Sequence, residues 1–156
     1  MAPDIVLRDY SAPTDFDEVF SFCREIISEP PCEEARAELA GYPARDLVAK
    51  VAVGEAGKPI GFCAATHPYW SGVAMIDYLV VAPPARGTGI GRQLVTAVEA
   101  VLREAGIRHV CVQAVSWNSD GIRFYEELGY ARLALLPEYF GAGNDAVWLS
   151  RRLPAV

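Results

Sequence analysis

Basic charge and long apolar runs are both scarce in this sequence, and each scarcity excludes a class of protein. The 14 lysines and arginines are outnumbered by 20 aspartates and glutamates, which gives a net charge of −6. Basic residues such as Arg8, Lys50, Arg103 and Arg132 are scattered along the chain, whereas a nucleic-acid-binding face needs them in clusters. No apolar run approaches the length of a membrane span. We therefore expect neither a nucleic-acid partner nor a membrane partner.

Cysteine and histidine are few as well. The four cysteines have no close paired spacing of the kind that zinc sites use, so no metal ion is expected. Cys63 and Cys111 lie in strand-like apolar runs and are interpreted as buried thiols. This fits a reduced, cytoplasmic setting, as does a chain start without the regions of a signal peptide. His109 is predicted to lie on the surface, and whether His67 touches a substrate is left open.

What the sequence does contain is the composition of a globular protein. Its 156 residues are 52% hydrophobic and 22% charged, and a chain of this length buries about two-thirds of its unfolded surface, so residues 1–156 are expected to form a single domain. Apolar periodicity and turn residues predict strands at Ile5–Tyr10, Leu47–Val53, Ile60–Ala65, Val73–Val81, Val110–Val115, Tyr130–Leu136 and Ala146–Leu153. Spacings of three and four with capping residues predict helices at Thr14–Ile27 (with Thr14 as the cap), Cys32–Ala40, Gly89–Ala105 and Ser119–Leu128.

This order of elements predicts an α/β fold. One strand, two helices and three strands are followed by a helix, a strand, a helix and two strands. This order indicates one mixed sheet with helices on both faces. The segment Met75–Val115 is predicted to be a right-handed parallel crossover of strand, helix and strand. The almost unbroken apolar run at Val110–Val115 is typical of an interior strand that is covered on both faces.

A glycine-rich segment between a strand and an amphipathic helix is the first candidate for a ligand site. It reads Arg86-Gly87-Thr88-Gly89-Ile90-Gly91. Glycines let the backbone approach a ligand, and free N–H groups at a helix start attract an anion, to which Arg86 can add a charge-assisted contact. A glycine-rich turn without a ligand is the alternative. A P-loop is excluded because it needs a Gly-Lys-Ser/Thr ending, and a dinucleotide fold because its glycine turn follows the first strand.

This segment resembles the cofactor motif of the GNAT family of N-acetyltransferases, Gln/Arg-x-x-Gly-x-Gly/Ala, and the order of elements is similar to that fold from end to end. A second family motif follows at a matching distance: Asn118, then Phe124-Tyr125-Glu126-Glu127-Leu128-Gly129-Tyr130. One glycine motif is weakly specific, but two motifs in register with matching elements are strongly specific. The resemblance implies a mostly antiparallel sheet with a parallel strand-helix-strand cofactor unit, and an enzyme that uses acetyl-CoA as co-substrate.

The resemblance also implies roles for individual residues. Backbone groups of Leu79, Val80 and Val81 would bind the acetyl carbonyl and the pantetheine arm, where this strand separates from its parallel neighbour. Asn118 would hydrogen-bond the cofactor near its pantetheine, and Tyr125 would lie close to the sulfur. The pyrophosphate would be wrapped by Arg86, Gly87, Thr88, Gly89, Ile90, Gly91 and Arg92.

Acetyl transfer needs a neutral amine, a stabilised carbonyl oxygen and an acid for the departing thiolate. A phenol suits the last task because its proton can move as the sulfur gains charge, so Tyr125 is predicted to be the general acid; packing beside Ile122 is the alternative. In the peptide N-terminal branch of the family a glutamate commonly sits five positions before the motif asparagine, but here that position is Gln113, which cannot take a proton. Asp77 either acts as a base through a water or is a solvated edge carboxylate.

The C-terminal segment carries a further likeness. Tyr139-Phe140, a short loop and then Asn144–Leu149 are similar to the last hairpin of ribosomal-protein and related N-terminal acetyltransferases, where the aromatic pair lies over the acceptor peptide. Glu138 and Asn144 depart from the residues typical there, and an ordinary aromatic hairpin is the alternative. Gln113, Glu138 and Tyr139 are predicted to face the acceptor.

The acceptor is expected to be a primary amine, either at the N-terminus of a peptide or protein or in a small molecule. At pH 7 an α-amino group is about 10% neutral and a lysine about 0.04% neutral, so a site without a strong base favours the α-amine. Small-molecule amines, including polyamines, stay open as acceptors, and a non-catalytic acetyl-CoA-binding regulatory module stays open as a function. A homodimer and a monomer are both compatible with the sequence.

Overall fold

The central feature of the fold is a seven-stranded sheet with the strand order β1-β2-β3-β4-β5-β7-β6. The computed structural model describes residues 4–23, 40, 47–68 and 70–156. All neighbouring strands run antiparallel except β4 and β5, which are parallel, so the predicted mixed sheet is confirmed. The strands are β1 (Val6–Asp9), β2 (Leu47–Val53), β3 (Pro59–Thr66), β4 (Val73–Val81), β5 (His109–Val115), β6 (Ala131–Leu136) and β7 (Ala146–Arg152).

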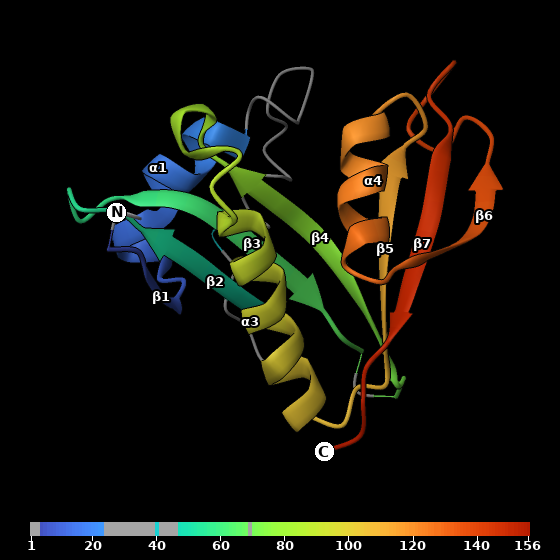
Figure 1. The fold of residues 1–156 in the computed structure, drawn as a ribbon, viewed down its shortest axis with the longest axis horizontal. Coiled ribbons are helices and arrows are strands. Elements are labelled where there is room, and N and C mark those ends of the chain that lie inside the picture. The colour runs from blue at the N-terminus through green and yellow to red at the C-terminus, as the bar shows by residue number, and fades with distance from the viewer. Residues whose placement is uncertain (1–3, 24–39, 41–46, 69) are drawn as a thin grey trace.

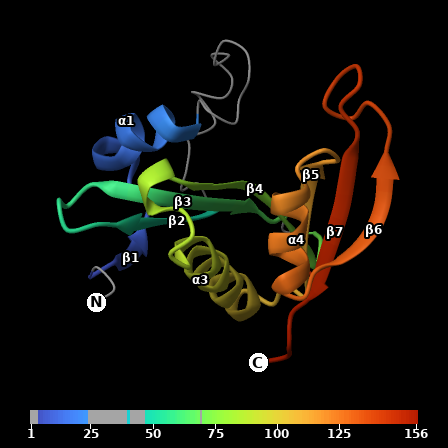
Figure 2. The ribbon, with the colours of Figure 1, turned by 45° about the horizontal axis from the view of Figure 1, so that its top comes forward.

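Helices cover both faces of this sheet, as predicted. Helix α1 (Ala12–Cys23) lies on one face and α3 (Ile90–Glu104) on the other, after a short 3₁₀ helix, η1 (Pro83–Ala85). Figure 2 shows α1 and α3 on opposite sides of β2 and β3. Helix α4 (Ser119–Glu127) shares a core with α3. Among the described residues, no helix has the length and apolar character needed to cross a membrane.

Two hydrophobic cores hold these layers together, one on each face of the sheet. Because successive side chains of a strand point to opposite faces, β3 contributes to both: Cys63 and Ala65 join the core under α3, and Phe62 and Ala64 join the core under α1. Leu94 of α3 is fully buried in the first core. Around β3 the sheet is therefore a buried middle layer between α1 and α3.

The start of α1 differs from the sequence expectation, in which Thr14 is the cap. The helix begins at Ala12, and the carbonyl of Ser11 accepts hydrogen bonds from the N–H groups of Thr14 (3.1 Å) and Asp15 (2.8 Å). The Asp15 carboxylate in turn accepts from the Ser11 N–H at 2.8 Å. Pro13 fits the first turn, where its missing N–H has no helical partner to lose. The cap prediction is wrong by three residues because the reciprocal bonds between Ser11 and Asp15 cap the helix there instead.

The other expected bounds agree closely with the structure. Strands β2 and β4 have the predicted ends. The other predicted elements after α1 differ by one residue, at one end or, for β3 and α3, at both ends. The expected end of the first helix at Ile27 and the expected helix Cys32–Ala40 lie outside the described residues, apart from Ala40 itself.

Strands β4 and β5 pair along only part of their length. The parallel ladder joins Val73–Ile76 to His109–Val112 and then ends, while Gln113–Val115 of β5 continue to pair with β7. Figure 1 shows β4 and β5 meeting at the lower right and separating toward the top. Residues 77–81 of β4 and 113–115 of β5 therefore border an interruption in the sheet, which we call the opening.

A β-bulge lies where the two strands separate. Across the β3–β4 pair, Ala64 opposes Tyr78 and Ala65 opposes Ile76, so Asp77 is an extra residue on β4. A bulge bends its strand and increases the local twist, which directs the rest of β4 away from β5. Asp77 thus marks the beginning of the opening.

Candidate active site

The glycine-rich segment forms the turn from β4 through η1 into α3. Gly89 flanks the start of α3, and no side chain caps this end of the helix. The Gln93 N–H donates to the Gly89 carbonyl at 3.1 Å, and the N–H groups of residues 90–92 precede the first helical bond and so have no partner within the helix. Free amides at the positive end of a helix dipole form a binding site for an anion.

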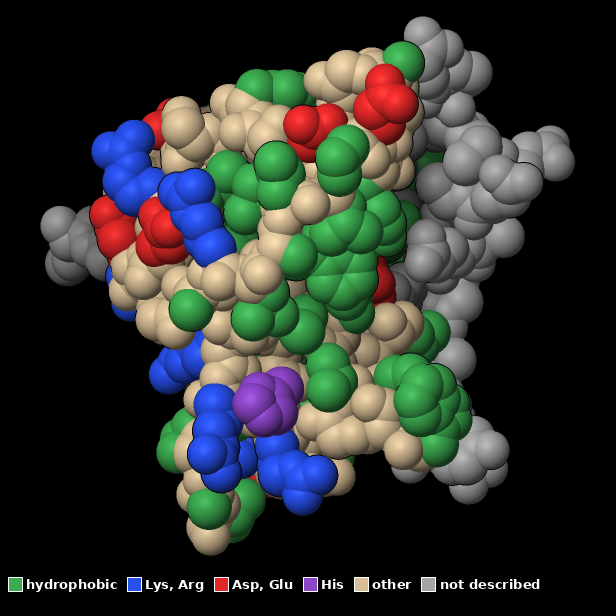
Figure 3. Space-filling model, turned by 90° about the vertical axis from the view of Figure 1, so that its right-hand side faces the viewer, with side chains coloured by type: hydrophobic (Ala, Val, Ile, Leu, Met, Phe, Trp, Pro, Cys, Tyr) green, Lys and Arg blue, Asp and Glu red, His purple; other side chains and the backbone are tan. Residues whose placement is uncertain are grey.

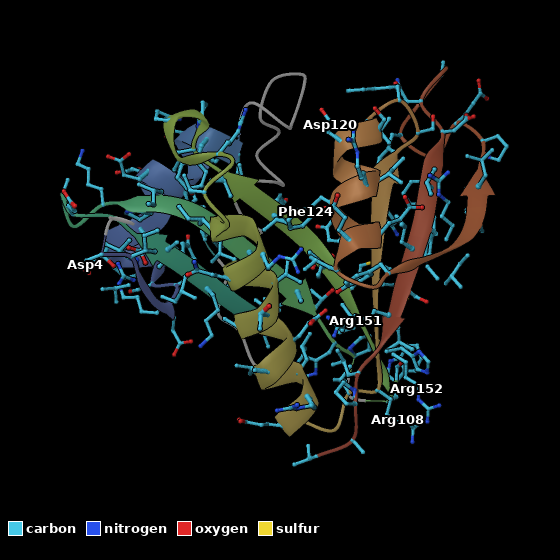
Figure 4. All side chains as sticks on the ribbon, in the orientation of Figure 1. Asp4, Arg108, Asp120, Phe124, Arg151 and Arg152 are labelled. Atoms are coloured by element: carbon cyan, nitrogen blue, oxygen red, sulfur yellow. The ribbon has the colours of Figure 1, made fainter. Side chains whose placement is uncertain are left out.

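Glycine is required in this turn by its backbone conformation. Gly87 and Gly89 have φ angles of 75° and 87°, in the left-handed region that glycine adopts without steric cost. A Cβ added at either position would meet no atom within 4 Å, so the space beside the turn is open. Gly91 instead serves close packing, since its added Cβ would lie 3.4 Å from the ring of Phe124. Figure 4 shows Phe124 projecting from α4 on the side of α3.

Two side chains of this turn bind its own backbone. The Arg86 Nε donates to the Val81 carbonyl at 2.9 Å, and the Thr88 hydroxyl donates to the Ala85 carbonyl at 2.6 Å. Because Val81 is the last residue of β4, these bonds fix the turn against the end of the strand that borders the opening. Arg86 and Thr88 are both exposed.

Asn118 has a structural role that the sequence reasoning did not assign. It caps α4, and its Oδ1 accepts a hydrogen bond from the Gly121 N–H at 3.0 Å, as asparagine commonly does at helix starts. A Cβ at Gly121 would lie 2.5 Å from the Asn118 Nδ2, so glycine is needed for this cap. The cap engages Oδ1 and leaves Nδ2 as the group that can donate to a ligand.

Tyr125 is buried on the inner side of α4. Its side chain is 7% exposed, and its ring packs edge-on against Tyr130 with centroids 5.3 Å apart. Burial raises the pKa of its phenol well above the ordinary value, and the electrostatic interaction with Cys63 raises it further. The phenol therefore stays protonated at neutral pH, which is the form that a general acid needs. Burial beside Ile122, the alternative reading, is also observed.

The thiol of Cys63 interacts electrostatically with both predicted catalytic side chains. Burial raises the pKa of the Cys63 thiol, and the nearby carboxylates of Glu99 and Asp77 raise it further. The thiol also acts electrostatically on Tyr125, and its register partner on β4 is Leu79. The prediction that Cys63 is a buried free thiol is confirmed, as it is for Cys111, but its interaction with these two groups was missed.

A second set of predicted residues lies on the opposite face of the sheet. Val112 and Ala114 belong to the core under α3 and α4, so Gln113 between them points to the other face. Gln113 is in register with Trp148 of β7, and the Trp148 ring lies 6.0 Å from the ring of Tyr139. The amide, the indole and the phenol therefore form a row beside the opening.

Trp148 is a candidate residue that the sequence reasoning missed. Its Nε1 is buried and has no hydrogen-bond partner in the described part of the protein, which is unusual for a buried donor. The sequence shows only an aromatic residue in an expected strand, so no signal beyond its residue type pointed to this position.

The β6–β7 connection holds Tyr139 in place through polar contacts. Glu138 adopts a positive φ of 53°, and its N–H donates to the Asp145 carboxylate at 2.8 Å. The Trp117 Nε1 donates to the Asn144 Oδ1 at 3.0 Å, which ties this hairpin to the turn before α4. Asn144, which departs from the family pattern, therefore has a structural role in this protein.

The two histidines lie away from the opening. His109 is exposed, as predicted, and belongs to the paired part of β5. His67 follows β3 and lines a shallow cavity with Gly72 and Ile107, near the paired end of β4. In the described ranges, no three His, Cys, Asp or Glu side chains are grouped so as to hold a metal ion.

Comparison with known proteins agrees with this geometry. The acetyltransferase (GNAT) family model matches residues 14–130, well over half of the chain. Streptothricin acetyltransferase of Streptomyces lavendulae is 28% identical over 143 residues, which cover 84% of this chain and 76% of that protein. N-alpha-acetyltransferase MAK3 of Arabidopsis thaliana is 35% identical over 79 residues, 51% of this chain and 42% of that protein.

A solved structure shares the whole fold. The ribosomal-protein-S18-alanine N-acetyltransferase from Escherichia coli superposes with a TM-score of 0.82 over 97% of this chain and 96% of that chain, at 17% identity. At that identity the likeness shows the fold alone. Together with the family match, the interrupted sheet and the glycine turn at the start of α3, this means that the chain belongs to the GNAT family of acetyltransferases, enzymes whose co-substrate is acetyl-CoA.

Proposed function

We propose that this enzyme transfers the acetyl group to a primary amine inside the opening, with acetyl-CoA bound on the α3–α4 face and the amine entering from the opposite face. The observation that carries the proposal is the division of side chains at the opening. Tyr125 lies on the face of α3 and α4, and the row formed by Gln113, Trp148 and Tyr139 lies on the other. Two substrates that approach from opposite faces meet only where the sheet is interrupted.

The cofactor side is supported by the free backbone groups. The pyrophosphate binds the N–H groups at the start of α3, in the turn from Arg86 to Arg92. The pantetheine lies along Leu79–Val81, whose β5 side has no paired strand. Asn118 donates from Nδ2, since Oδ1 is engaged by the helix cap. In the binding mode that we propose, the thioester lies beside Tyr125.

The chemistry is attack of a neutral amine on the thioester carbonyl. The C–N bond forms, the C–S bond breaks, and Tyr125 donates its proton to the departing sulfur. The amine nitrogen loses a proton, which Asp77 accepts through a water. Solvent then carries a proton back to the Tyr125 phenolate. Asp77 suits this task because it is exposed at the point where β4 leaves β5.

The favoured acceptor is the α-amino group of a peptide or protein N-terminus. Gln113 supplies no base, so an amine that is already partly neutral at pH 7 has the advantage. The Tyr139 ring is 46% exposed and offers an apolar surface to the first residues of a peptide, while Glu138 attracts its cationic amine.

The decisive measurement is the ratio of kcat/KM for a peptide with a free α-amine to that for its N-terminally blocked, lysine-bearing twin. We expect a ratio well above one. A ratio at or below one, or activity confined to small polyamines or antibiotics, would favour the second candidate, a small-molecule amine acceptor. That candidate is supported by the similarity to streptothricin acetyltransferase over most of the chain.

Two substitutions test the acceptor side separately from the cofactor side. Because Gln113 supplies no base and Asp77 acts only through a water, the rate should climb as the pH rises toward the pKa of the acceptor, and Gln113→Glu should flatten this climb. Tyr139→Ala should raise KM for the peptide and leave the Kd of acetyl-CoA unchanged. Leu133→Ala is the matched control, because Leu133 is an exposed apolar residue of the same hairpin outside the row.

A non-catalytic acetyl-CoA sensor is distinguished by thiol release. If no amine in a panel of peptides and small molecules releases free coenzyme A above background, the chain binds acetyl-CoA without transferring the acetyl group. Release that depends on the amine supports the enzyme.

A further inference from the structure

A cavity at the paired end of β4 and β5 collects arginines that are scattered in the sequence. It has a volume of about 690 Å³ and lies at the lower end of β5 and β7, far from the glycine turn. Figure 3, a view from the right-hand side of Figure 1, shows basic side chains gathered beside a histidine at its lower end. The arginines that line the cavity are Arg103, Arg108, Arg151 and Arg152.

The fold brings these side chains together from three elements. Arg103 stands in the last turn of α3, and Arg108 follows in the connection to β5. The carbonyl of Arg108 accepts from the Leu153 N–H at 2.8 Å, and Arg152 is in register with His109. Figure 4 shows Arg108 and Arg152 at the lower ends of β5 and β7. The expectation that basic residues stay scattered is therefore wrong here, because antiparallel pairing of β5 with β7 joins distant arginines.

Three of these arginines form no ion pair with a described residue. Arg151 forms an ion pair with Glu99 at 2.9 Å, whereas Arg103, Arg108 and Arg152 form none within the described part of the chain. Like charges brought together repel one another unless an anion lies between them. The gathering is notable in a chain whose net charge is −6.

One of the arginines that line this cavity also has a buried N–H without a partner. The Nε of Arg103 is buried and makes no hydrogen bond to any described residue. Buried N–H groups of native proteins are nearly always paired with protein, water or an ion. An anion that binds the arginines lining the cavity would balance the positive charge gathered there.

We propose that this cavity is a binding site for a small multivalent anion of the phosphate class, separate from the acetyl-CoA site. Guanidinium groups bind phosphate oxygens with paired, charge-assisted hydrogen bonds. The site stands at the opposite end of the β4–β5 ladder from the free amides of α3, so both sites can be filled at once. The ligand chemistry is that of a polyphosphate or a nucleotide phosphate tail.

The test is calorimetry with sodium tripolyphosphate on the whole chain, saturated beforehand with coenzyme A so that the glycine turn is occupied. We expect saturable binding of one tripolyphosphate per chain, weakened by added salt. Arg108→Gln and Arg152→Gln should each weaken it about tenfold, the usual effect of losing one charge-assisted hydrogen bond. Arg132→Gln is the matched control, because it removes the same charge from an exposed arginine on β6 that pairs with Glu126.

The outcomes separate the sources of the anion and the ways in which the proposal fails. Saturable binding of inorganic phosphate with similar affinity indicates a free-phosphate site, and a strong preference for ATP over tripolyphosphate indicates a nucleotide site; both support the proposal. The proposal is overturned if no tripolyphosphate binds at millimolar concentration, or if Arg132→Gln weakens binding as much as Arg152→Gln. It is also overturned if tripolyphosphate binds the protein without coenzyme A but not the protein saturated with it. Thermal unfolding of each variant confirms that it is folded. If Arg108→Gln does not fold, Arg152→Gln alone carries the test, because Arg152 is exposed.

Discussion

The two ends of the β4–β5 pair are built in different ways. At the lower end the strands are joined by the ladder between Val73–Ile76 and His109–Val112, and side chains of several elements bond across it. At the upper end the ladder is absent, and the groups that remain are backbone amides, a buried phenol and an exposed carboxylate. One end thus holds the two parts of the sheet together, and the other keeps polar groups available to substrates.

A buried polar network illustrates the closed end. Glu99 of α3 is 7% exposed and accepts from the Tyr130 hydroxyl at 2.7 Å and from the Arg151 guanidinium at 2.9 Å. These bonds connect α3 to the chain after α4 and to β7. Burial raises the pKa of Tyr130, as does its hydrogen bond to the Glu99 carboxylate, so this phenol is a permanent donor at neutral pH. The hydroxyl of Tyr130 is thus bonded to Glu99, whereas the neighbouring Tyr125 is the phenol that we assign to catalysis.

The largest expected effect is at the open end. Gly89→Asp should weaken acetyl-CoA binding by on the order of 100-fold or more, because a carboxylate would stand where the anion binds at the start of α3. The measurement is calorimetry on the folded variant. Gly57→Asp is the control, since Gly57 in the β2–β3 turn also has a positive φ, 72°, and open space around it. Equal affinity in both variants would remove the glycine turn from the cofactor site.

The next largest effect concerns Tyr125. Tyr125→Phe should lower kcat by on the order of 10²-fold, the usual scale for the loss of a general acid, with little change in the Kd of acetyl-CoA. Steady-state kinetics and calorimetry measure the two quantities. If kcat holds and only KM rises, the phenol is a binding contact and the acid role is lost.

The matching change at the closed end should act on stability instead. Tyr130→Phe leaves the Glu99 carboxylate without one of its two donors and should lower the free energy of unfolding by about 1–2 kcal/mol. Urea unfolding gives this value, and the Kd of acetyl-CoA should stay unchanged. A loss of kcat as large as that of Tyr125→Phe, without loss of stability, would contradict the division between the two ends.

The smallest effect is expected from acid, at the edge of the sheet away from both ends. Burial alone would raise the pKa of Asp15, but hydrogen bonds from Arg8, at 2.7 Å, and from the Ser11 N–H outweigh it and lower this pKa. A lowered pKa in the folded state stabilises the fold above the unfolded pKa, near 3.9, and this stabilisation is lost as the pH falls through the folded value.

Urea unfolding between about pH 6 and pH 3 checks this prediction. The stability of the unmodified protein should decrease as the pH falls, and Asp15→Asn should decrease less over the same range. An identical pH dependence in both proteins would show that the hydrogen bonds to the Asp15 carboxylate contribute nothing measurable to it.

The sequence by itself determined the elements and the order in which they occur. Alternating and three-to-four spacings located β2, β4 and α3 to within a residue, because local periodicity reflects which face of each element is buried. The glycine turn was also local: the positive φ angles of Gly87 and Gly89 require residue types that can be read directly. The start of α1 was not, since Ser11 and Asp15 compete with Thr14 for the same cap.

Only the tertiary structure decided what meets across the sheet. The bulge at Asp77 depends on how β3 and β4 align, and the interaction of Cys63 with Tyr125 depends on how α4 packs on the sheet. The row from Gln113 through Trp148, and the arginine cavity, both depend on the register of β5 with β7. Such contacts join residues that are tens of positions apart, and their register is set by the packing of whole strands, which no local pattern of residues encodes.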